Sequence, residues 1–168
     1  MKLFLRATLQ AMLLTTTIGL FGCDSGTKTE RSSESPATAN VSRTAAEIIT
    51  VNKPWIRATA PGQTISGAFM TLVNNSATAY ALSAVSFSDA NTVEIHETSM
   101  NDGMMRMRRV SHIDIPANGS TELKPGSYHV MLIGLEREMK AGTAESLTLT
   151  FSDNSQKIIE AAVGNSGD

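Results

Sequence analysis

Residues 128–135, YHVMLIGL, form the most apolar run beyond the N-terminal leader. Their length and their large or β-branched apolar side chains predict a buried β-strand. Side chains two residues apart in a strand lie on the same face, so the imidazole of His129 and the thioether of Met131 should be neighbours. This pair alone has two interpretations: a core methionine beside a hydrogen-bonded histidine, or two ligands of one metal ion.

The sequence around this run predicts many more short strands separated by turn residues. Asn101-Asp102-Gly103 is a strong hairpin signal between two of them. Only residues 136–144 have room for a helical turn. The other expected strands are residues 55–57, 66–74, 80–87, 92–98, 104–110, 113–116, 120–125, 145–151 and 156–163. Short strands at this spacing predict an all-β fold, either an antiparallel β-sandwich or a barrel.

Residues 1–23 have the composition of a secretory signal peptide. Lys2 and Arg6 precede an apolar stretch at 7–21 that is too short and too polar for a membrane span. The segment ends in LFGC at 20–23, which resembles the lipobox of bacterial lipoproteins. We therefore expect Cys23 to be lipidated and the protein to be extracytoplasmic, in the periplasm, and anchored to the membrane. The alternative is a plain signal peptide with an unmodified cysteine.

The composition changes after the leader. Residues 24–47 are rich in Ser, Thr and Ala and poor in apolar residues, which predicts a flexible tether. Residues 48–164 remain as one domain of ordinary size. Removing Lys2 and Arg6 with the leader leaves 12 basic and 16 acidic residues, and this net charge of −4 argues against nucleic-acid binding.

The predicted domain offers little for catalysis. The only cysteine of the chain is Cys23, so the domain has no disulfide and no thiol. No nucleophile–base pair, paired-carboxylate motif or zinc-hydrolase motif stands out, so we do not expect an enzyme. A blue-copper electron carrier is also disfavoured, because such sites use a cysteine thiolate.

Methionine is concentrated in one part of the domain. Five of the nine methionines lie between residues 100 and 131, and the chain has three histidines. If the hairpin turn pairs residue 101 with residue 104, His96 faces Arg109 and Met107 lies diagonally from His96. A slip of two residues would still leave His96 and Met107 on one face. The methionines are Met100, Met104, Met105, Met107 and Met131, and the histidines are His96, His112 and His129.

Four donors converge if residues 128–135 pass close to this hairpin: His96, Met107, His129 and Met131. Thioethers are soft ligands that select Cu(I) and bind zinc, calcium or magnesium poorly. They also form no disulfides in an oxidising compartment. The pattern therefore predicts a Cu(I) site. We expect His112 at the surface, and Met100, Met104 and Met105 as auxiliary thioethers or as locally packed hairpin residues.

The spacing His96-x10-Met107-x21-His129-x-Met131 resembles the motif of the periplasmic copper chaperones of the PCu(A)C family. Similar sequence extends over residues 50–163 and includes WIRA at 55–58, EIHE at 94–97 and KPG at 124–126. The resemblance implies a cupredoxin-like β-sandwich of Greek-key type. It also implies delivery of Cu(I) to an oxidase subunit or an assembly factor during cytochrome c oxidase assembly.

Two other functions remain open. A periplasmic copper or silver storage or tolerance protein could use the same four ligands. A lipid-anchored β-sandwich could instead serve as an interaction module that binds no metal.

Overall fold

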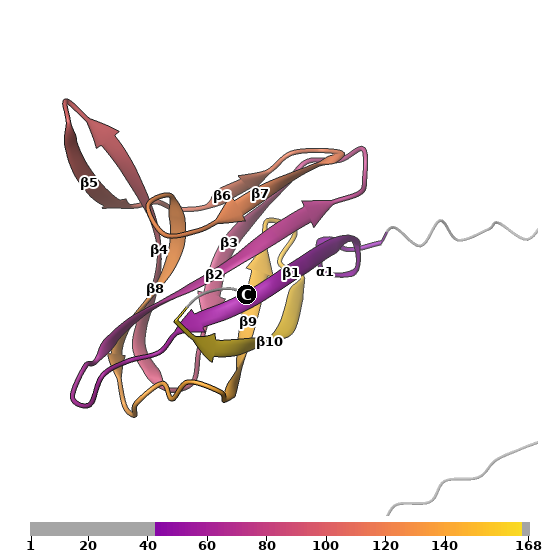
Figure 1. Ribbon diagram of the computed structural model, residues 1–168. Coiled ribbons are helices and arrows are strands. Elements are labelled where there is room, and N and C mark those ends of the chain that lie inside the picture. Colours follow the sequence, from indigo (N-terminus) through magenta and orange to yellow (C-terminus); the bar gives the residue numbers. More distant parts are fainter. Residues whose placement is uncertain (1–42, 166–168) are drawn as a thin grey trace, which may run out of the picture. The chain divides into compact units, whose positions relative to one another are not determined.

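The computed structural model describes residues 43–165, and nearly all regular structure in them is β-strand (Figure 1). The signal peptide, Cys23 and the tether before residue 43 lie outside the described residues. The elements are α1 (Ala45–Ile48), β1 (Ile49–Arg57), β2 (Ile65–Asn74), β3 (Tyr80–Ser86), β4 (Ala90–Asn101), β5 (Met104–Arg109), β6 (Ile113–Ile115), β7 (Gly119–Leu123), β8 (Tyr128–Leu135), β9 (Ala144–Phe151) and β10 (Gln156–Gly164). Within residues 43–165, no helix has the length and apolar character needed to cross a membrane.

The strands pair in the order β5-β4-β8-β7-β2-β1-β10-β9-β3-β6, and β8 also pairs with β2. The strands fold around one apolar core, with β5 and β6 as the two edges of the sheet, which confirms the expected all-β sandwich. Two pairings, β1–β10 and β7–β8, are parallel rather than antiparallel. A parallel ladder such as β1–β10 needs a long connection, and here the whole domain supplies it, because β1 and β10 are its first and last strands. The β7–β8 pairing is a single residue pair, Leu123 with Tyr128, at the end of a short turn.

Alternation of side chains places the core as the sequence predicts. Leu147, Leu149 and Phe151 on β9 are fully buried. On β8, Val130 and Leu132 are fully buried among the core residues. Because side chains alternate along a strand, Met131, which lies between these two residues, is on the opposite face of the sheet, away from the core.

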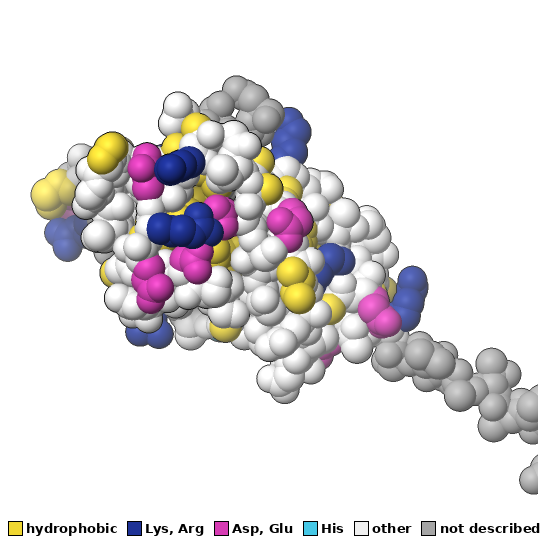
Figure 2. Space-filling model, turned by 90° about the horizontal axis from the view of Figure 1, so that it is seen from below, with side chains coloured by type: hydrophobic (Ala, Val, Ile, Leu, Met, Phe, Trp, Pro, Cys, Tyr) yellow, Lys and Arg dark blue, Asp and Glu magenta, His cyan; other side chains and the backbone are white. Residues whose placement is uncertain are grey.

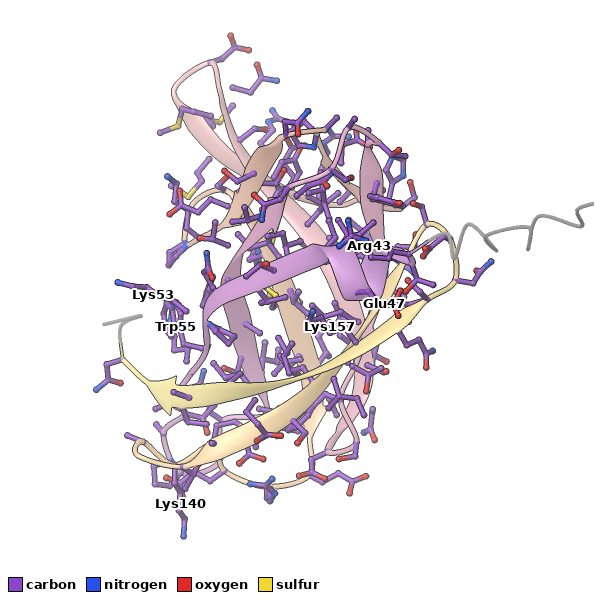
Figure 3. The ribbon with its side chains drawn as sticks, turned by 90° about the vertical axis from the view of Figure 1, so that its right-hand side faces the viewer. Arg43, Glu47, Lys53, Trp55, Lys140 and Lys157 are labelled. Carbon is purple, nitrogen blue, oxygen red and sulfur yellow. The ribbon has the colours of Figure 1, made fainter. Side chains whose placement is uncertain are left out.

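The domain begins earlier than its composition predicts. Residues 45–47, expected in the tether, form most of α1, with Thr44 as its N-cap, and Ala45 is fully buried. Side chains from the β9–β10 region satisfy the helix ends. Asp153 Oδ2 accepts the Ala45 N–H at 2.7 Å. Lys157, labelled in Figure 3, donates through Nζ to the Ala46 and Ile49 carbonyls. Because these partners are more than 100 residues away along the chain, local composition gives no sign of them.

The helical turn considered for residues 136–144 is absent from the structure. This connection is instead held by tertiary contacts. The Arg137 guanidinium donates to both carboxylate oxygens of Glu145, at 2.9 and 2.6 Å, and to Asp89. Met139 is fully buried, and its N–H donates to Thr59 Oγ1 at 2.9 Å.

On the face seen in Figure 2, basic side chains lie beside acidic ones rather than in a patch of one sign.

Replacing Asp153 by Ala should lower the free energy of unfolding by about 1–2 kcal/mol, because the Ala45 and Ser155 N–H groups lose their acceptor. Burial raises the pKa of the Asp153 carboxyl, but its hydrogen bonds outweigh burial and the net shift is downward. The contribution is therefore present above the unfolded pKa and is lost as the pH falls through the folded pKa. Urea unfolding from neutral to strongly acidic pH measures this.

The matched control for Asp153→Ala is Asp114→Ala, whose side chain is 85% exposed. We expect it to change stability by less than about 0.5 kcal/mol. Equal destabilisation by the two variants, or an Asp153→Ala effect that persists in strong acid, would contradict the anchoring of α1 by this carboxylate.

Candidate metal centre

Strand register brings the four candidate ligands (His96, Met107, His129 and Met131) to one face of three neighbouring strands. His96 of β4 pairs with His129 of β8, and Glu94 pairs with Met131. On the other side of β4, His96 pairs with Arg109 and Thr98 pairs with Met107. The predicted hairpin register, in which residue 101 pairs with residue 104, is confirmed. Paired residues share a face, and so do residues two apart, so all four ligands lie on the same side of the sheet.

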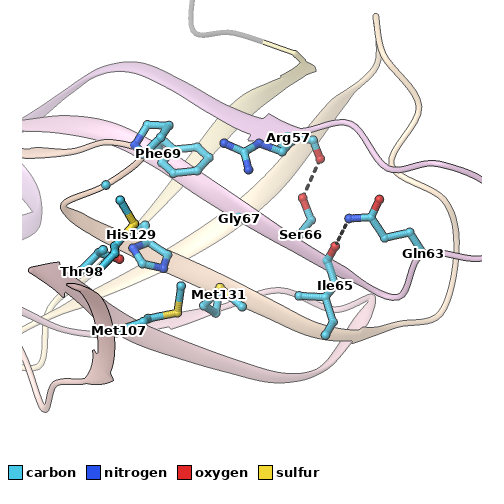
Figure 4. A pocket seen from close by; sticks show the side chains of 13 residues that line it. Arg57, Gln63, Ile65, Ser66, Gly67, Phe69, Thr98, Met107, His129 and Met131 are labelled. Atoms are coloured by element: carbon cyan, nitrogen blue, oxygen red, sulfur yellow. Dashed lines mark hydrogen bonds between the residues drawn. The ribbon is translucent and has the colours of Figure 1, made fainter. Parts of the chain in front are cut away.

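A pocket of about 280 Å³ opens beside these strands (Figure 4). Met107, His129 and Met131 are among its lining residues. In Figure 4 the two thioether side chains point toward the His129 ring. His96 is not part of the lining: it lies one strand further on, with its ring centroid 5.9 Å from that of His129.

The floor of the pocket comes from β2 and β1. Gly67 pairs with Met131, and the absence of a side chain at Gly67 keeps the space above this part of β2 open. A Cβ at this position would lie 3.0 Å from the Phe69 ring. Phe69 stacks on Trp55 with 4.4 Å between centroids and lies 6.4 Å from the His129 ring. These aromatic rings form an apolar support on the side of His129 away from His96.

The His129 ring is held in one orientation. Only 6% of the residue is exposed, and its Nδ1 lies 2.9 Å from the Ser127 carbonyl oxygen. A carbonyl oxygen can only accept, so in the neutral imidazole Nδ1 carries the proton and donates it. The lone pair is then on Nε2, the nitrogen left free to bind a metal ion.

The His96 ring is held in the opposite tautomer to that of His129. Its Nε2 lies 2.8 Å from Glu94 Oε2, so the neutral imidazole donates from Nε2 and carries its lone pair on Nδ1. His96 Nδ1 is buried without a hydrogen-bond partner, the one such side-chain atom found between residues 43 and 165. Buried polar atoms without partners are rare in folded proteins. This nitrogen is therefore available to a ligand that the protein itself does not supply.

Glu94 is the carboxylate that orients His96. The hydrogen bond from His96 lowers the pKa of the Glu94 carboxyl; partial burial opposes this, and the charge of Arg109 adds to the lowering. Arg109 Nη1 lies 3.2 Å from Glu94 Oε1. An ionised Glu94 can only accept, which fixes the tautomer of His96.

The two thioethers are less confined than the imidazoles. Met107 is 55% exposed at the rim of the pocket, whereas Met131 on β8 is partly buried. His112 lies at the surface, where its ring contacts Ser111 and Asp114, and it takes no part in this cluster. No group of three His, Cys, Asp or Glu side chains suited to a metal ion occurs in the described part of the chain, so a centre here depends on thioethers.

Four further residues shape the site that the sequence pattern does not assign to it: Glu94, Ser127, Gly67 and Phe69. Glu94 could have been found, because it lies two residues before His96 on the same strand and so shares its face. Ser127 acts through its backbone carbonyl, which any residue could supply. The contribution of β2 depends on its pairing with β8, for which the sequence carries no short-range signal.

Solved structures that match this fold include PCuAC domains and a Cu(I)-bound protein. The copper-bound PCuAC domain from PmoF2 matches with a TM-score of 0.62 and 27% identity, over 73% of this chain and 97% of that one. The solution structure of CuI-DR1885 from Deinococcus radiodurans matches with a TM-score of 0.59 and 28% identity, over 77% of this chain and 87% of that one. The fold and the arrangement of the strands thus define a PCuAC-type domain, as the motif predicts.

The chain belongs to the LpqE-like family, since the family model described as "Putative lipoprotein LpqE-like" matches residues 49–163. "Putative lipoprotein Lxx21020" of Leifsonia xyli subsp. xyli is 35% identical over 161 residues, which cover 95% of this chain and 89% of that protein. "Uncharacterized protein RP573" of Rickettsia prowazekii is 33% identical over 117 residues, or 67% of this chain and 65% of that protein.

Long-range ¹H–¹⁵N spectra in mildly alkaline solution should show His96 protonated on Nε2 and His129 protonated on Nδ1. The hydrogen bonds to Glu94 and to the Ser127 carbonyl set these opposite tautomers. Glu94→Ala should release His96 into a mixture of tautomers and leave His129 unchanged. A wild-type spectrum with His129 protonated on Nε2 would contradict the described orientation of that ring.

Proposed function

We propose that this chain is an extracytoplasmic copper chaperone that carries Cu(I) as cargo on His96 Nδ1, His129 Nε2 and the sulfurs of Met107 and Met131. One observation carries the proposal. Each imidazole already donates its N–H to an acceptor inside the protein, which leaves the other nitrogen of each ring free on the face that also carries both thioethers. Metal-binding histidines typically have this arrangement, with a carboxylate or carbonyl behind the ring.

The donor set favours Cu(I) over other biological metals. Two thioethers and two neutral imidazoles carry no formal charge, and soft sulfur donors suit a soft monovalent ion. Zinc, calcium and magnesium prefer harder or charged ligands than thioethers. The copper-bound PmoF2 domain and CuI-DR1885 support copper as the cargo, because they share the fold at 27% and 28% identity.

Transfer of the metal requires a ligand that a partner can displace. Met107 suits this role because it lies at the rim of the pocket, on a projecting hairpin, and is 55% exposed (Figure 1). A pocket of about 280 Å³ is also much larger than one ion, so a partner side chain has room to enter beside the metal. This exposure favours transfer over storage, since a storage site gains from shielding all of its ligands.

The resemblance to PCu(A)C chaperones supports a respiratory oxidase as the destination of the copper. The acceptor would be the copper-receiving subunit of a respiratory oxidase or one of its assembly factors. A lipid on Cys23, joined to the domain by residues 24–42, would keep the site in the periplasm within reach of such a membrane-bound acceptor. A storage protein and a metal-free interaction module are the competing functions.

Exchanging both thioethers in a Met107→Leu, Met131→Leu variant should weaken Cu(I) binding by roughly 100-fold or more, since even the loss of a supporting group around a metal can cost 10- to 100-fold. Leucine keeps the volume of methionine, so the fold should survive. The measurement is an anaerobic competition with a chromophoric Cu(I) chelator. Every sample is the full chain with Cys23→Ser, so that no thiol competes for copper.

His112→Ala is the matched control, because His112 lies at the surface outside the cluster. Its Cu(I) affinity should equal that of the parent chain. An affinity unchanged by loss of both thioethers would overturn the proposed ligand set, and no Cu(I) binding by the parent chain would leave the interaction module as the better description.

A further inference from the structure

The hairpin of β4 and β5 carries more thioethers than the proposed centre uses. It projects from the sandwich in Figure 1, and its tip pairs Met100 directly with Met105. Met100 is 69% exposed and Met105 is 67% exposed, so neither side chain serves the core. Exposed methionines at a hairpin tip therefore need an explanation other than packing.

Alternation divides the hairpin into two chemically different faces. Residues two apart on one strand share a face, and paired residues share it too. One face, which we call the thioether face, carries Thr98, Met100, Met105, Met107 and Arg109 together with His96. The opposite face carries Glu97, Ser99, Met104, Arg106 and Arg108.

The thioether face is continuous with the pocket. Met100 and Met105 are directly opposite, which places their Cβ atoms about 4.5–5.5 Å apart, within reach of a common ion for two flexible side chains. Met107 follows two residues after Met105, and both line the pocket beside Met131. Three thioethers thus lead from the hairpin tip to the proposed centre.

The charges on the hairpin leave this row of sulfurs accessible to a cation. Arg106 and Arg108 belong to the opposite face, and Arg108 is paired with Glu97. Arg109 is on the thioether face at the end furthest from the tip, where it pairs with Glu94 at 3.2 Å. No described Lys or Arg therefore lies between Met100 and Met107 on the thioether face.

We propose that Met100 and Met105 form a second, outer Cu(I) site, weaker than the centre in the pocket and connected to it through Met107. This inference rests on the proposed function. Two neutral thioethers supply the same soft donors as the inner site but no imidazole, so the outer site should hold Cu(I) less firmly. The ion would pass inward by exchange of one metal–sulfur bond for another, and copper would stay in the +1 state throughout.

Protein docking is the other use that such a surface could have. Interfaces are anchored by Trp, Tyr and Arg side chains in buried clusters. The outer part of the thioether face, from Thr98 to Met105, carries no aromatic or branched aliphatic side chain. Its composition therefore suits a metal better than a protein.

The direct experiment follows each methionine separately. The full chain with Cys23→Ser is labelled with [¹³C-methyl]methionine and titrated with Cu(I) under anaerobic conditions. The Met107 and Met131 methyl signals should shift with the first equivalent, and those of Met100 and Met105 with the second. The Met104 signal, on the opposite face of the same hairpin, should stay in place.

A Met100→Leu, Met105→Leu variant should reduce Cu(I) uptake from two equivalents to one and leave the first equivalent at parental affinity. Met104→Leu, the matched control on the same hairpin, should keep both equivalents. Leucine conserves volume, so neither variant should unfold. Two equivalents retained by the double variant, or the second lost in Met104→Leu, would overturn the outer site.

These experiments distinguish an error in the inner site from an error in the outer site. If the parent chain takes up one equivalent and only the Met107 and Met131 signals move, the outer site is overturned and the proposed function stands. If the parent chain takes up a single equivalent that the Met100→Leu, Met105→Leu exchange removes and the His129→Ala, Met131→Leu exchange does not, the inner centre is overturned and the outer site stands alone. No uptake by the parent chain would overturn both.

Discussion

The pairing of His96 with His129 across β4 and β8 is the constraint on which the candidate centre depends. It places both imidazoles on the outer face and, because the side-chain period of a strand is two, it also places Glu94 opposite Met131. A slip of one residue would turn this whole set toward the core. The centre is therefore only as stable as the register.

Burial of the opposite face holds that register. Val130 and Leu132 are fully buried, and Ile95, which pairs with Val130, is 5% exposed. Each such side chain contributes roughly 1.5–3 kcal/mol when it leaves water. A one-residue slip would expose these groups and bury Glu94 in their place, so the core that stabilises the sandwich also fixes the geometry of the face that carries the four candidate ligands.

The two imidazoles among the four candidate ligands are held in place, whereas one of the two thioethers is exposed. The imidazoles are held by hydrogen bonds to Glu94 and to the Ser127 carbonyl, and aromatic rings from β1 and β2 support His129. Met107, in contrast, is exposed on a hairpin that projects from the domain. Fixed nitrogens give selectivity and orientation, while an exposed sulfur permits exchange, and a copper carrier would need both.

How much of this arrangement the sequence predicts depends on how far apart the interacting residues lie along the chain. The Asn101-Asp102-Gly103 turn sets the hairpin register locally. In contrast, the His96–His129 pair joins β4 and β8 across 33 residues, and Asp153 caps α1 from 108 residues away. Only the His–Met spacing, through its resemblance to a known motif, predicted that β4 and β8 meet.

X-ray absorption at the copper edge tests the central claim most directly. The full chain with Cys23→Ser, loaded with one equivalent of Cu(I), should show both nitrogen and sulfur scatterers, with two imidazoles and two thioethers around the metal. His129→Ala should remove one imidazole from that shell and leave the sulfurs. A spectrum with sulfur alone or with no sulfur, or one unchanged by His129→Ala, would contradict a centre assembled by the β4–β8 register.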